Sequence, residues 1–209
     1  MPDKHAVLSA SSSHRWLECP PSALLCSAAG DTPSEFAMQG TDAHSLCEHK
    51  LKTALGQQSK DPTENLSFFD EEMADCSDMY AQYVMEQLAA AKQKCKDPIV
   101  LIEQRLDFSN WVPQGFGTGD CVIVADETLT VIDFKYGVGI LVEAEKNPQM
   151  MCYALGALQL FDSIYDIDSV TMTIFQPRRD SVSTYTISKE ELLKWADEVL
   201  APTAQLAAK

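Results

Sequence analysis

The chain has 209 residues, of which 45% are hydrophobic and 22% are charged. This composition excludes a disordered or collagen-like chain and a small disulfide-dependent scaffold, and it predicts one domain with its own core. The 16 basic and 31 acidic residues give a net charge of −15. This charge argues against binding of nucleic acid by bulk attraction, unless metal ions or a local basic patch invert the field.

Membrane and export signals are not found in the sequence. No apolar run approaches the ~18 residues of a membrane span, and the first residues, MPDKHAVLSASSS, predict no secretory signal. The seven cysteines include no CxxC pair, so we expect reduced thiols in a cytosol, most of them as small core residues. Seven acids and no Lys or Arg lie between Asp61 and Asp78, which predicts a solvated loop and helix face.

Three helices are predicted in the first half of the chain. Ser11, Ser12 or Ser13 would cap a short helix that stops before two prolines. Thr41 would cap a second helix that ends at Gly56, and a third would run from Asp70 to Lys96. The apolar faces of the second and third helices are predicted to consist of Ala43, Leu46, Cys47, Leu51 and Leu55, and of Met73, Tyr80, Val84, Leu88 and Ala91.

The second half alternates between strand and helix patterns. Strands are predicted over 98–108, 119–125, 128–136, 169–177 and 181–188, with a helix over 147–161 and a last helix over 189–200 that Ser188 caps. The order is helix, helix, three strands, helix, two strands, helix, after the short N-terminal helix. This mixed order predicts an α/β (α+β) fold with a central mixed β-sheet flanked by helices.

A charged pair stands at the end of the third strand. Asp133 and Lys135 are two residues apart, so they share a face of the strand with Val131, and Thr130, Ile132 and Phe134 face the other way. Charges on an apolar strand need a partner or a metal. Two interpretations stay open here: a structural Asp–Lys pair, or a divalent-metal site in which Lys135 assists a nucleophile.

Other polar residues fit the second interpretation as a group. Glu103 and Asp120 lie on neighbouring predicted strands and would converge with Asp133 at one edge, and His44 lies in the first turn of a predicted helix. Gln149 and Tyr153 are at i and i+4 on one helix face. Taken singly, each has a plainer interpretation: a capping or surface histidine, a charge at a ladder edge, a core tyrosine.

The order and spacing of this set resemble the PD-(D/E)XK nuclease superfamily, in its RecB-like branch. That pattern has a GTxxH helix, a GxxD or GxD strand start, a (D/E)xK strand and a QxxxY helix. Residues 40–44 (GTDAH), 117–120 (GTGD), 132–135 (IDFK) and 149–153 (QMMCY) match these four elements in order. The chain is also similar to an uncharacterised phage-encoded RecB-like family in HRWLECPPSA and NPQMMCYALGAL. The resemblance covers residues 9–200 and implies a single nuclease domain over 1–209 with a restriction-endonuclease-like core.

The resemblance implies a metal-dependent catalytic centre. Asp120 and Asp133 would hold Mg²⁺ or Mn²⁺ together with the Phe134 carbonyl. His44 would be an additional ligand, which favours Mn²⁺ because imidazole suits softer metals than Mg²⁺. Lys135 would orient or deprotonate the attacking water, so that Asp120, Asp133 and Lys135 form the catalytic set.

The resemblance also implies a substrate and a setting. Gln149 and Tyr153 would contact the scissile DNA strand, and Glu103 matches a less regular acidic position. The expected activity is hydrolysis of DNA phosphodiester bonds, as an exonuclease of phage recombination or repair in the bacterial cytoplasm. The expected partners are DNA and phage recombination or replication proteins, with no membrane partner. The oligomeric state stays open.

One feature departs from the family pattern. Many RecB-like nucleases hold an iron–sulfur cluster with one cysteine before the core and three after it. Cys19 matches the first, but no cysteine follows Cys152, so we expect no iron–sulfur cluster and interpret Cys19 as a buried core thiol. The chain would be either truncated before a cysteine-rich tail or a short version without the cluster. Two other interpretations remain: a non-catalytic acidic DNA mimic or interaction protein, and an inactive truncated nuclease.

Overall fold

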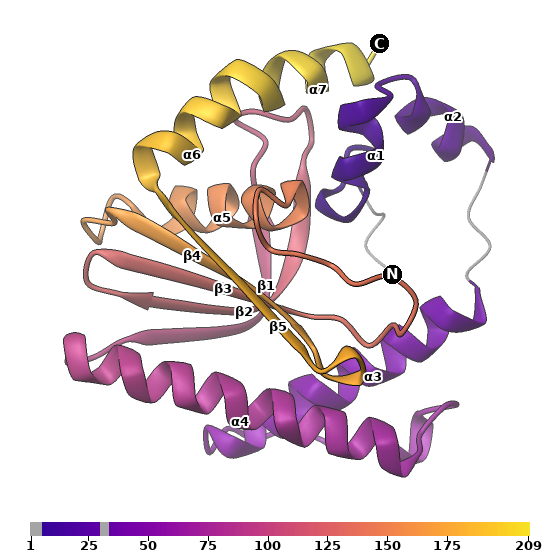
Figure 1. Ribbon diagram of the computed structural model, residues 1–209, viewed down its shortest axis with the longest axis vertical. Helices are drawn as coiled ribbons and strands as arrows, with labels where there is room; N and C mark the ends of the chain where they lie inside the picture. The colour runs from indigo at the N-terminus through magenta and orange to yellow at the C-terminus, as the bar shows by residue number, and fades with distance from the viewer. Residues whose placement is uncertain (1–5, 30–33) are drawn as a thin grey trace.

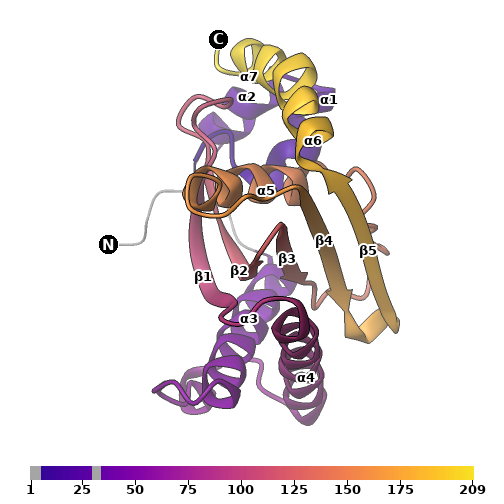
Figure 2. The same cartoon turned by 90° about the vertical axis from the view of Figure 1, so that its left-hand side faces the viewer.

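A five-stranded mixed sheet lies between two layers of helices, as the computed structural model shows (Figure 1). The structure describes residues 6–29 and 34–209. Residues 1–5 lie outside this range. They belong to the N-terminal segment for which we expected no secretory signal. Helices α3 and α4 cover one face of the sheet and α5 the other, with α6 and α7 beyond α5 (Figure 2). The predicted mixed α/β fold is therefore confirmed.

The strands are β1 (Ile99–Asp107), β2 (Phe116–Ala125), β3 (Thr128–Phe134), β4 (Ser169–Gln176) and β5 (Ser181–Ser188). The helices and helical turns are η1 (Ala10–Ser12), α1 (Ser13–Glu18), α2 (Ser22–Ala29), α3 (Glu35–Ala54), η2 (Thr63–Asn65), α4 (Glu71–Lys94), α5 (Pro148–Phe161), η3 (Pro177–Arg179), α6 (Lys189–Trp195), η4 (Ala196–Leu200) and α7 (Ala201–Ala207).

The sheet follows the order of the chain. Strands β1, β2 and β3 pair antiparallel, β3 and β4 pair parallel, and β4 and β5 pair antiparallel. The one parallel pair needs a long crossover, and α5 supplies it. The predicted alternation on β3 is confirmed, because Val131 packs on the α5 side and both Ile132 and Phe134 pack on the α3 and α4 side.

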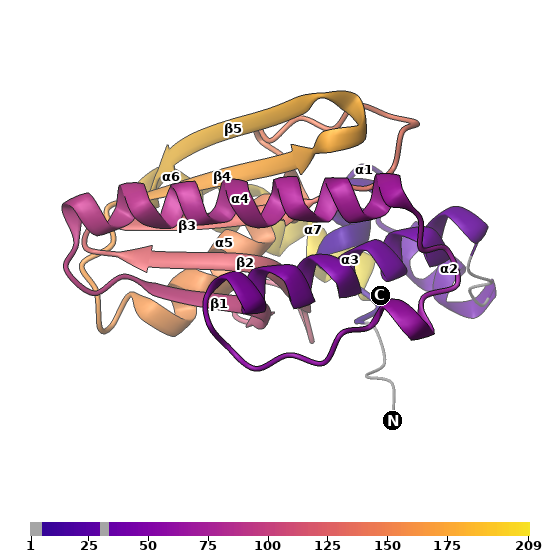
Figure 3. The ribbon, with the colours of Figure 1, turned by 90° about the horizontal axis from the view of Figure 1, so that it is seen from below.

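Helices α3 and α4 lie side by side across the sheet (Figure 3). Their predicted apolar faces are confirmed, with Leu55 and Ala91 only partly buried. The predicted start of the second helix is wrong, however. The helix begins at Glu35, where the Ser34 hydroxyl accepts from the Ala37 N–H at 3.2 Å. Thr41 lies inside it and donates to the Ala37 carbonyl at 3.1 Å, because a threonine hydroxyl can bond back to the preceding turn instead of capping.

Helix α5 is apolar on all sides because it is buried on all sides. Residues 150–158 are buried without interruption. The helix starts as predicted, with Pro148 in its first turn and the Asn147 side chain accepting from two backbone N–H groups. Ser188 caps α6, also as predicted, and the structure shows that it does so in a capping box with Glu191. The last helical segment is longer than predicted, because the chain passes through the π-helical turn η4 and continues into α7 beyond Pro202.

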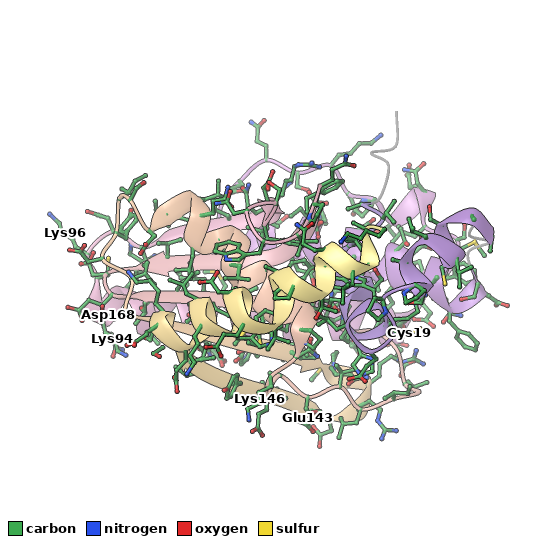
Figure 4. The ribbon with its side chains drawn as sticks, turned by 90° about the horizontal axis from the view of Figure 1, so that it is seen from above. Cys19, Lys94, Lys96, Glu143, Lys146 and Asp168 are labelled. Carbon is green, nitrogen blue, oxygen red and sulfur yellow. The ribbon has the colours of Figure 1, made fainter. Side chains whose placement is uncertain are left out.

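The charged and sulfur-containing residues divide between surface and core. All seven acids between Asp61 and Asp78 are exposed, which confirms the solvated face. Five of the seven cysteines are buried, but Cys19 and Cys26 are exposed. The prediction that Cys19 is a core thiol is therefore wrong. Cys19 is the residue that ends the short helix α1, and its side chain lies at the surface (Figure 4). Among the described residues, no helix is long and apolar enough to cross a membrane.

The packing of α5 on β1 depends on the absence of a side chain at Gly156. A Cβ there would lie 2.8 Å from the Leu106 Cβ and 3.1 Å from the Asp107 backbone N. We expect Gly156→Ala to lower the free energy of unfolding by about 1–3 kcal/mol, because the strand backbone would have to move. Urea unfolding measures this.

Gly40→Ala in α3 is the matched control, since no atom lies within 4 Å of the Cβ it adds. This control should stabilise the protein by about 0.5–1 kcal/mol through helix propensity. A loss of stability in Gly40→Ala, or none in Gly156→Ala, would contradict this account of the packing.

Candidate metal and nuclease site

Three acidic residues lie in one row across neighbouring strands. Ile102 pairs with Cys121 and Gln104 pairs with Gly119, so the register of β1 and β2 on both sides places Glu103 opposite Asp120. The register of β2 and β3, continued by one residue, places Asp120 opposite Asp133. Three carboxylates from separate segments of the chain therefore meet on one part of the sheet, where two helices reach them from opposite sides.

Helix α3 brings His44 to the first two of these acids. One ligand atom from each of His44, Glu103 and Asp120 lies within 4.8 Å of the others. The His44 Nδ1 is 3.1 Å from the Asp120 Oδ1, and the Phe134 N–H donates to the Asp120 Oδ2 at 2.6 Å. The ring of His44 packs edge-on against that of Phe134, with 5.5 Å between centroids. Asp120 thus joins α3 to β3 through its two oxygens.

Burial and mutual attraction determine the charges of this cluster. Burial alone would raise the pKa of Asp120, but the charge and hydrogen bond of His44 and the Phe134 N–H lower it below its usual value. Burial alone would lower the pKa of His44, but the negative charge of Asp120 and the hydrogen bond to it raise this pKa to about 9. Burial raises the pKa of Glu103 to about 7, and the negative charge of Asp120 adds to this effect.

The backbone at Glu103 is strained. Its φ of 50° lies in the left-handed region, which costs a residue with a side chain about 1–3 kcal/mol. The alternation of β1 changes at this point, because Leu101 and Leu106 pack on the same face although they are five residues apart. The left-handed residue is therefore where β1 exchanges its two faces, next to Asp120.

Helix α5 reaches the third acid from the other side of the sheet. Asp133 is 2% exposed, and its Oδ2 lies 2.9 Å from the Lys135 Nζ. The Gln149 side chain donates to the Asp133 Oδ1 and to the Tyr153 hydroxyl, both at 3.2 Å, and accepts from the Lys135 Nζ at 3.2 Å. These four residues form one connected polar network inside an apolar core.

Burial acts on this network as well. It raises the pKa of Asp133 despite the attraction of Lys135, and it raises the pKa of Tyr153. Burial alone would lower the pKa of Lys135, but the charge of Asp133 and the hydrogen bond to it raise it above the usual value. Lys135 is therefore held as a cation beside Asp133.

A glycine of the second motif gives Tyr153 its place. A Cβ at Gly117 would lie 2.6 Å from the Tyr153 Cε1 and 3.3 Å from the Ala10 Cβ. Only a residue without a side chain lets the tyrosine ring approach β2 so closely. Gly117 therefore belongs to the site as a packing position, although it carries no polar group.

The donor atoms here suit a divalent cation. Carboxylate oxygens and an imidazole nitrogen are ligands for Mn²⁺, and carboxylates alone for Mg²⁺. The only polar partner of the buried Asp133 Oδ2 among the described residues is the Lys135 ammonium at 2.9 Å. A carboxylate oxygen has two lone pairs, so one of them remains free for a cation. The residues present therefore fit a metal.

The structure sorts the residues that the sequence singled out into two groups. His44, Glu103 and Asp120 form the compact cluster of possible ligands, in which Glu103 has a more central place than its irregular motif position suggested. Asp133, Lys135, Gln149 and Tyr153 form the neighbouring network. Phe134 contributes its N–H and its ring.

Sequence reasoning missed Arg105, which lines a cavity beside Tyr153. The signal was present, since Arg105 is a lone cation on a strand, two residues after Glu103.

Comparison with known proteins gives a family. Residues 5–209 match the family described as "Protein of unknown function (DUF2800)". The chain belongs to this family. A solved structure described as "Crystal structure of SSO0001" is similar at 12% sequence identity, covering 77% of this chain and 86% of that one, with a TM-score of 0.24.

The charge on Glu103 should make the protein less stable at neutral pH. Its pKa of about 7 lies above the ordinary 4.5, so its contribution to stability falls as the pH rises from about 4.5 through 7. We expect Glu103→Gln to raise the free energy of unfolding at pH 8 by about 1–3 kcal/mol without divalent metal. Urea unfolding in EDTA measures this.

The gain should shrink towards pH 4.5, where both side chains are neutral. Glu145→Gln removes an exposed carboxylate outside the cluster and is the matched control, with no pH-dependent gain expected. A gain in Glu103→Gln that is the same at every pH would show that Glu103 does not carry a buried charge.

Proposed function

We propose that this protein is a metal-dependent deoxyribonuclease that hydrolyses the phosphodiester bonds of DNA, of the PD-(D/E)XK superfamily in its RecB-like branch. The observation that carries this proposal is the meeting of four distant motifs around one row of carboxylates. His44 reaches Asp120 from α3, and Gln149 reaches Asp133 and Lys135 from α5. A structural Asp–Lys pair alone would not need the histidine and the second and third acids beside it.

In this proposal Lys135 orients the attacking water as a cation. It does not deprotonate this water, because Asp133 raises the pKa of Lys135 and keeps its ammonium group protonated. The ammonium group lies at the end of β3, between the Asp133 carboxylate and the side-chain amide oxygen of Gln149. These two acceptors hold it in one position, so that its remaining N–H bond is directed and its charge faces the reacting phosphate. Gln149 and Tyr153 position the scissile strand from the α5 side.

The metal ion would be held by the side chains of Asp120, Asp133, His44 and Glu103. The Phe134 carbonyl would be a further oxygen ligand. A bound Mg²⁺ or Mn²⁺ lowers the pKa of water and neutralises charge on the phosphate during in-line displacement. Binding would displace the proton that Asp120 holds on His44, because an imidazole ligand must be neutral. Metal binding would therefore strengthen as the pH rises towards 9.

The net charge of −15 makes the cation a requirement for the substrate as well. Carboxylates in a row repel a phosphate, and only a cation between them reverses that local field. The family resemblance favours an exonuclease of phage recombination or repair, acting in the bacterial cytoplasm with phage recombination or replication proteins as partners. No iron–sulfur cluster enters this proposal.

Substitutions at Lys135 and Asp120 test the proposal. With Mn²⁺ and labelled single- and double-stranded DNA, we expect the parent protein to cut and Lys135→Ala to lose at least about 100-fold in kcat, the scale of losing one group that stabilises charge in the transition state. Asp120→Asn should lose activity and also bind Mn²⁺ more weakly, as measured by calorimetry. Lys135→Ala should keep its Mn²⁺ affinity, which separates the two roles.

Asp168→Asn is the control, because it removes an exposed carboxylate at the start of β4, outside the site (Figure 4). It should cut like the parent. If the parent cuts neither kind of DNA at saturating Mn²⁺, or if Lys135→Ala is fully active, the nuclease proposal is wrong. Tight capture of a DNA-binding enzyme by the inactive parent would then favour an acidic DNA mimic.

A further inference from the structure

A cavity of about 260 Å³ lies next to the candidate site. The N-terminal turn η1 forms one wall, and β1 and β2 with the side chain of Tyr153 form the others. The polar and aromatic groups that line it are Ser9, Ser11, Arg105, Phe116, Thr118 and Tyr153. Its size is close to that of the smaller ligand pockets of proteins, which suits one unpaired nucleotide better than a base pair.

The cavity shares one residue, Tyr153, with the proposed catalytic centre. Tyr153 stands in its wall, and the Tyr153 hydroxyl receives the hydrogen bond of Gln149, which also holds Asp133. Arg105 and Thr118 are register partners on β1 and β2. They lie two residues along these strands from Glu103 and Asp120.

Two residues of a strand span about 7 Å. This is comparable with the distance between neighbouring phosphates of an extended nucleic-acid strand. A strand with one phosphate at the row of acids would therefore place its next phosphate near Arg105.

The groups in the cavity suit a nucleotide in kind as well as in position. The Arg105 guanidinium lies 3.6 Å from the centroid of the Phe116 ring, and Arg105 is exposed without an ion pair among the described residues. The nearby Asp107 carboxylate is already bonded to the Ser109 N–H at 2.8 Å. Guanidinium groups bind phosphate with two N–H bonds, and aromatic rings accept bases by stacking.

We propose that this cavity holds the nucleotide next to the scissile phosphate of single-stranded DNA, with Arg105 binding its phosphate. The hydroxyls of Ser9, Ser11 and Thr118 line the same space and supply further donors. This inference rests on the proposed nuclease function and adds a substrate class to it: a single strand, or the unpaired end of a duplex. Arg105 is thereby a substrate-binding residue outside the four motifs.

The test uses a fluorescent oligothymidylate with Mn²⁺ and the full chain. We expect Arg105→Gln to raise KM about 10-fold and to change kcat less than about 3-fold, the effect of losing one phosphate contact. The slope of log(kcat/KM) against log[salt] should become shallower by about 0.7, the value for one phosphate contact on a single strand. Arg105→Lys keeps the charge and should restore the slope.

Lys96→Gln is the matched control. It removes one exposed positive charge just before the other end of β1 (Figure 4), and it should leave both KM and the slope unchanged. If the parent cuts DNA but Arg105→Gln has the parent's KM and slope, this inference is wrong and the nuclease proposal stands. If Lys96→Gln has the same effect as Arg105→Gln, the contact is non-specific and the inference is also wrong. If the parent cuts no DNA, the nuclease proposal fails and this inference falls with it.

Discussion

The buried carboxylate of Asp120 is the constraint on which the rest of the site depends. A charge in this position needs partners, because burial without them costs several kcal/mol. Its two oxygens have different ones: the His44 imidazole from α3 and the Phe134 N–H from β3. One side chain on β2 therefore ties together an adjacent strand and a helix that lies some 80 residues earlier in the chain. The position of His44, and through it of the whole ligand cluster, follows from this need for pairing.

The second half of the site depends on close packing rather than on charge. Helix α5 can bring Gln149 and Tyr153 to Asp133 only because it lies very near the sheet. Two glycines permit this approach, Gly156 against β1 and Gly117 against the tyrosine ring. Polar residues in so apolar a helix would be costly without partners, and the network of Asp133, Lys135, Gln149 and Tyr153 supplies them. Helices α3 and α5 thus bring polar side chains to one row of carboxylates from opposite faces of the sheet.

The acidic residues fall into two groups, one exposed on the surface and one buried or half-buried in the sheet. Those between Asp61 and Asp78 are exposed to water on a loop and on α4, where they cost little. Those in the row on β1, β2 and β3 are buried or half-buried. Burial raises the pKa of Glu103, and the negative charge of Asp120 adds to this effect. A strained backbone at the same residue adds to the free energy stored there. Strain and buried charge at one place are typical of a site that binds something.

Much of this could be predicted from the sequence, because short-range rules decide it. The alternation on β3, the apolar faces of α3 and α4, the Ser188 cap and the mixed sheet all follow from periods and local hydrogen bonds. The start of α3 could not be predicted, since Thr41 can cap a helix as Ser34 does. Only the structure shows that the residues before Thr41, from Glu35 on, are already helical. The exposure of Cys19 could not either, because it depends on how α1 packs on its neighbours.

The sequence by itself determined which polar residues interrupt the apolar strands and helices, and on which strand or helix each of them lies. Only the tertiary structure decided that Glu103 joins His44 and Asp120 whereas Asp133 contacts Lys135 and Gln149. It also decided that Arg105 lines a cavity together with Tyr153. The reason is physical: spacing along the chain sets the face on which a side chain lies, but strand register, helix packing and one left-handed residue set the distances between side chains from separate elements.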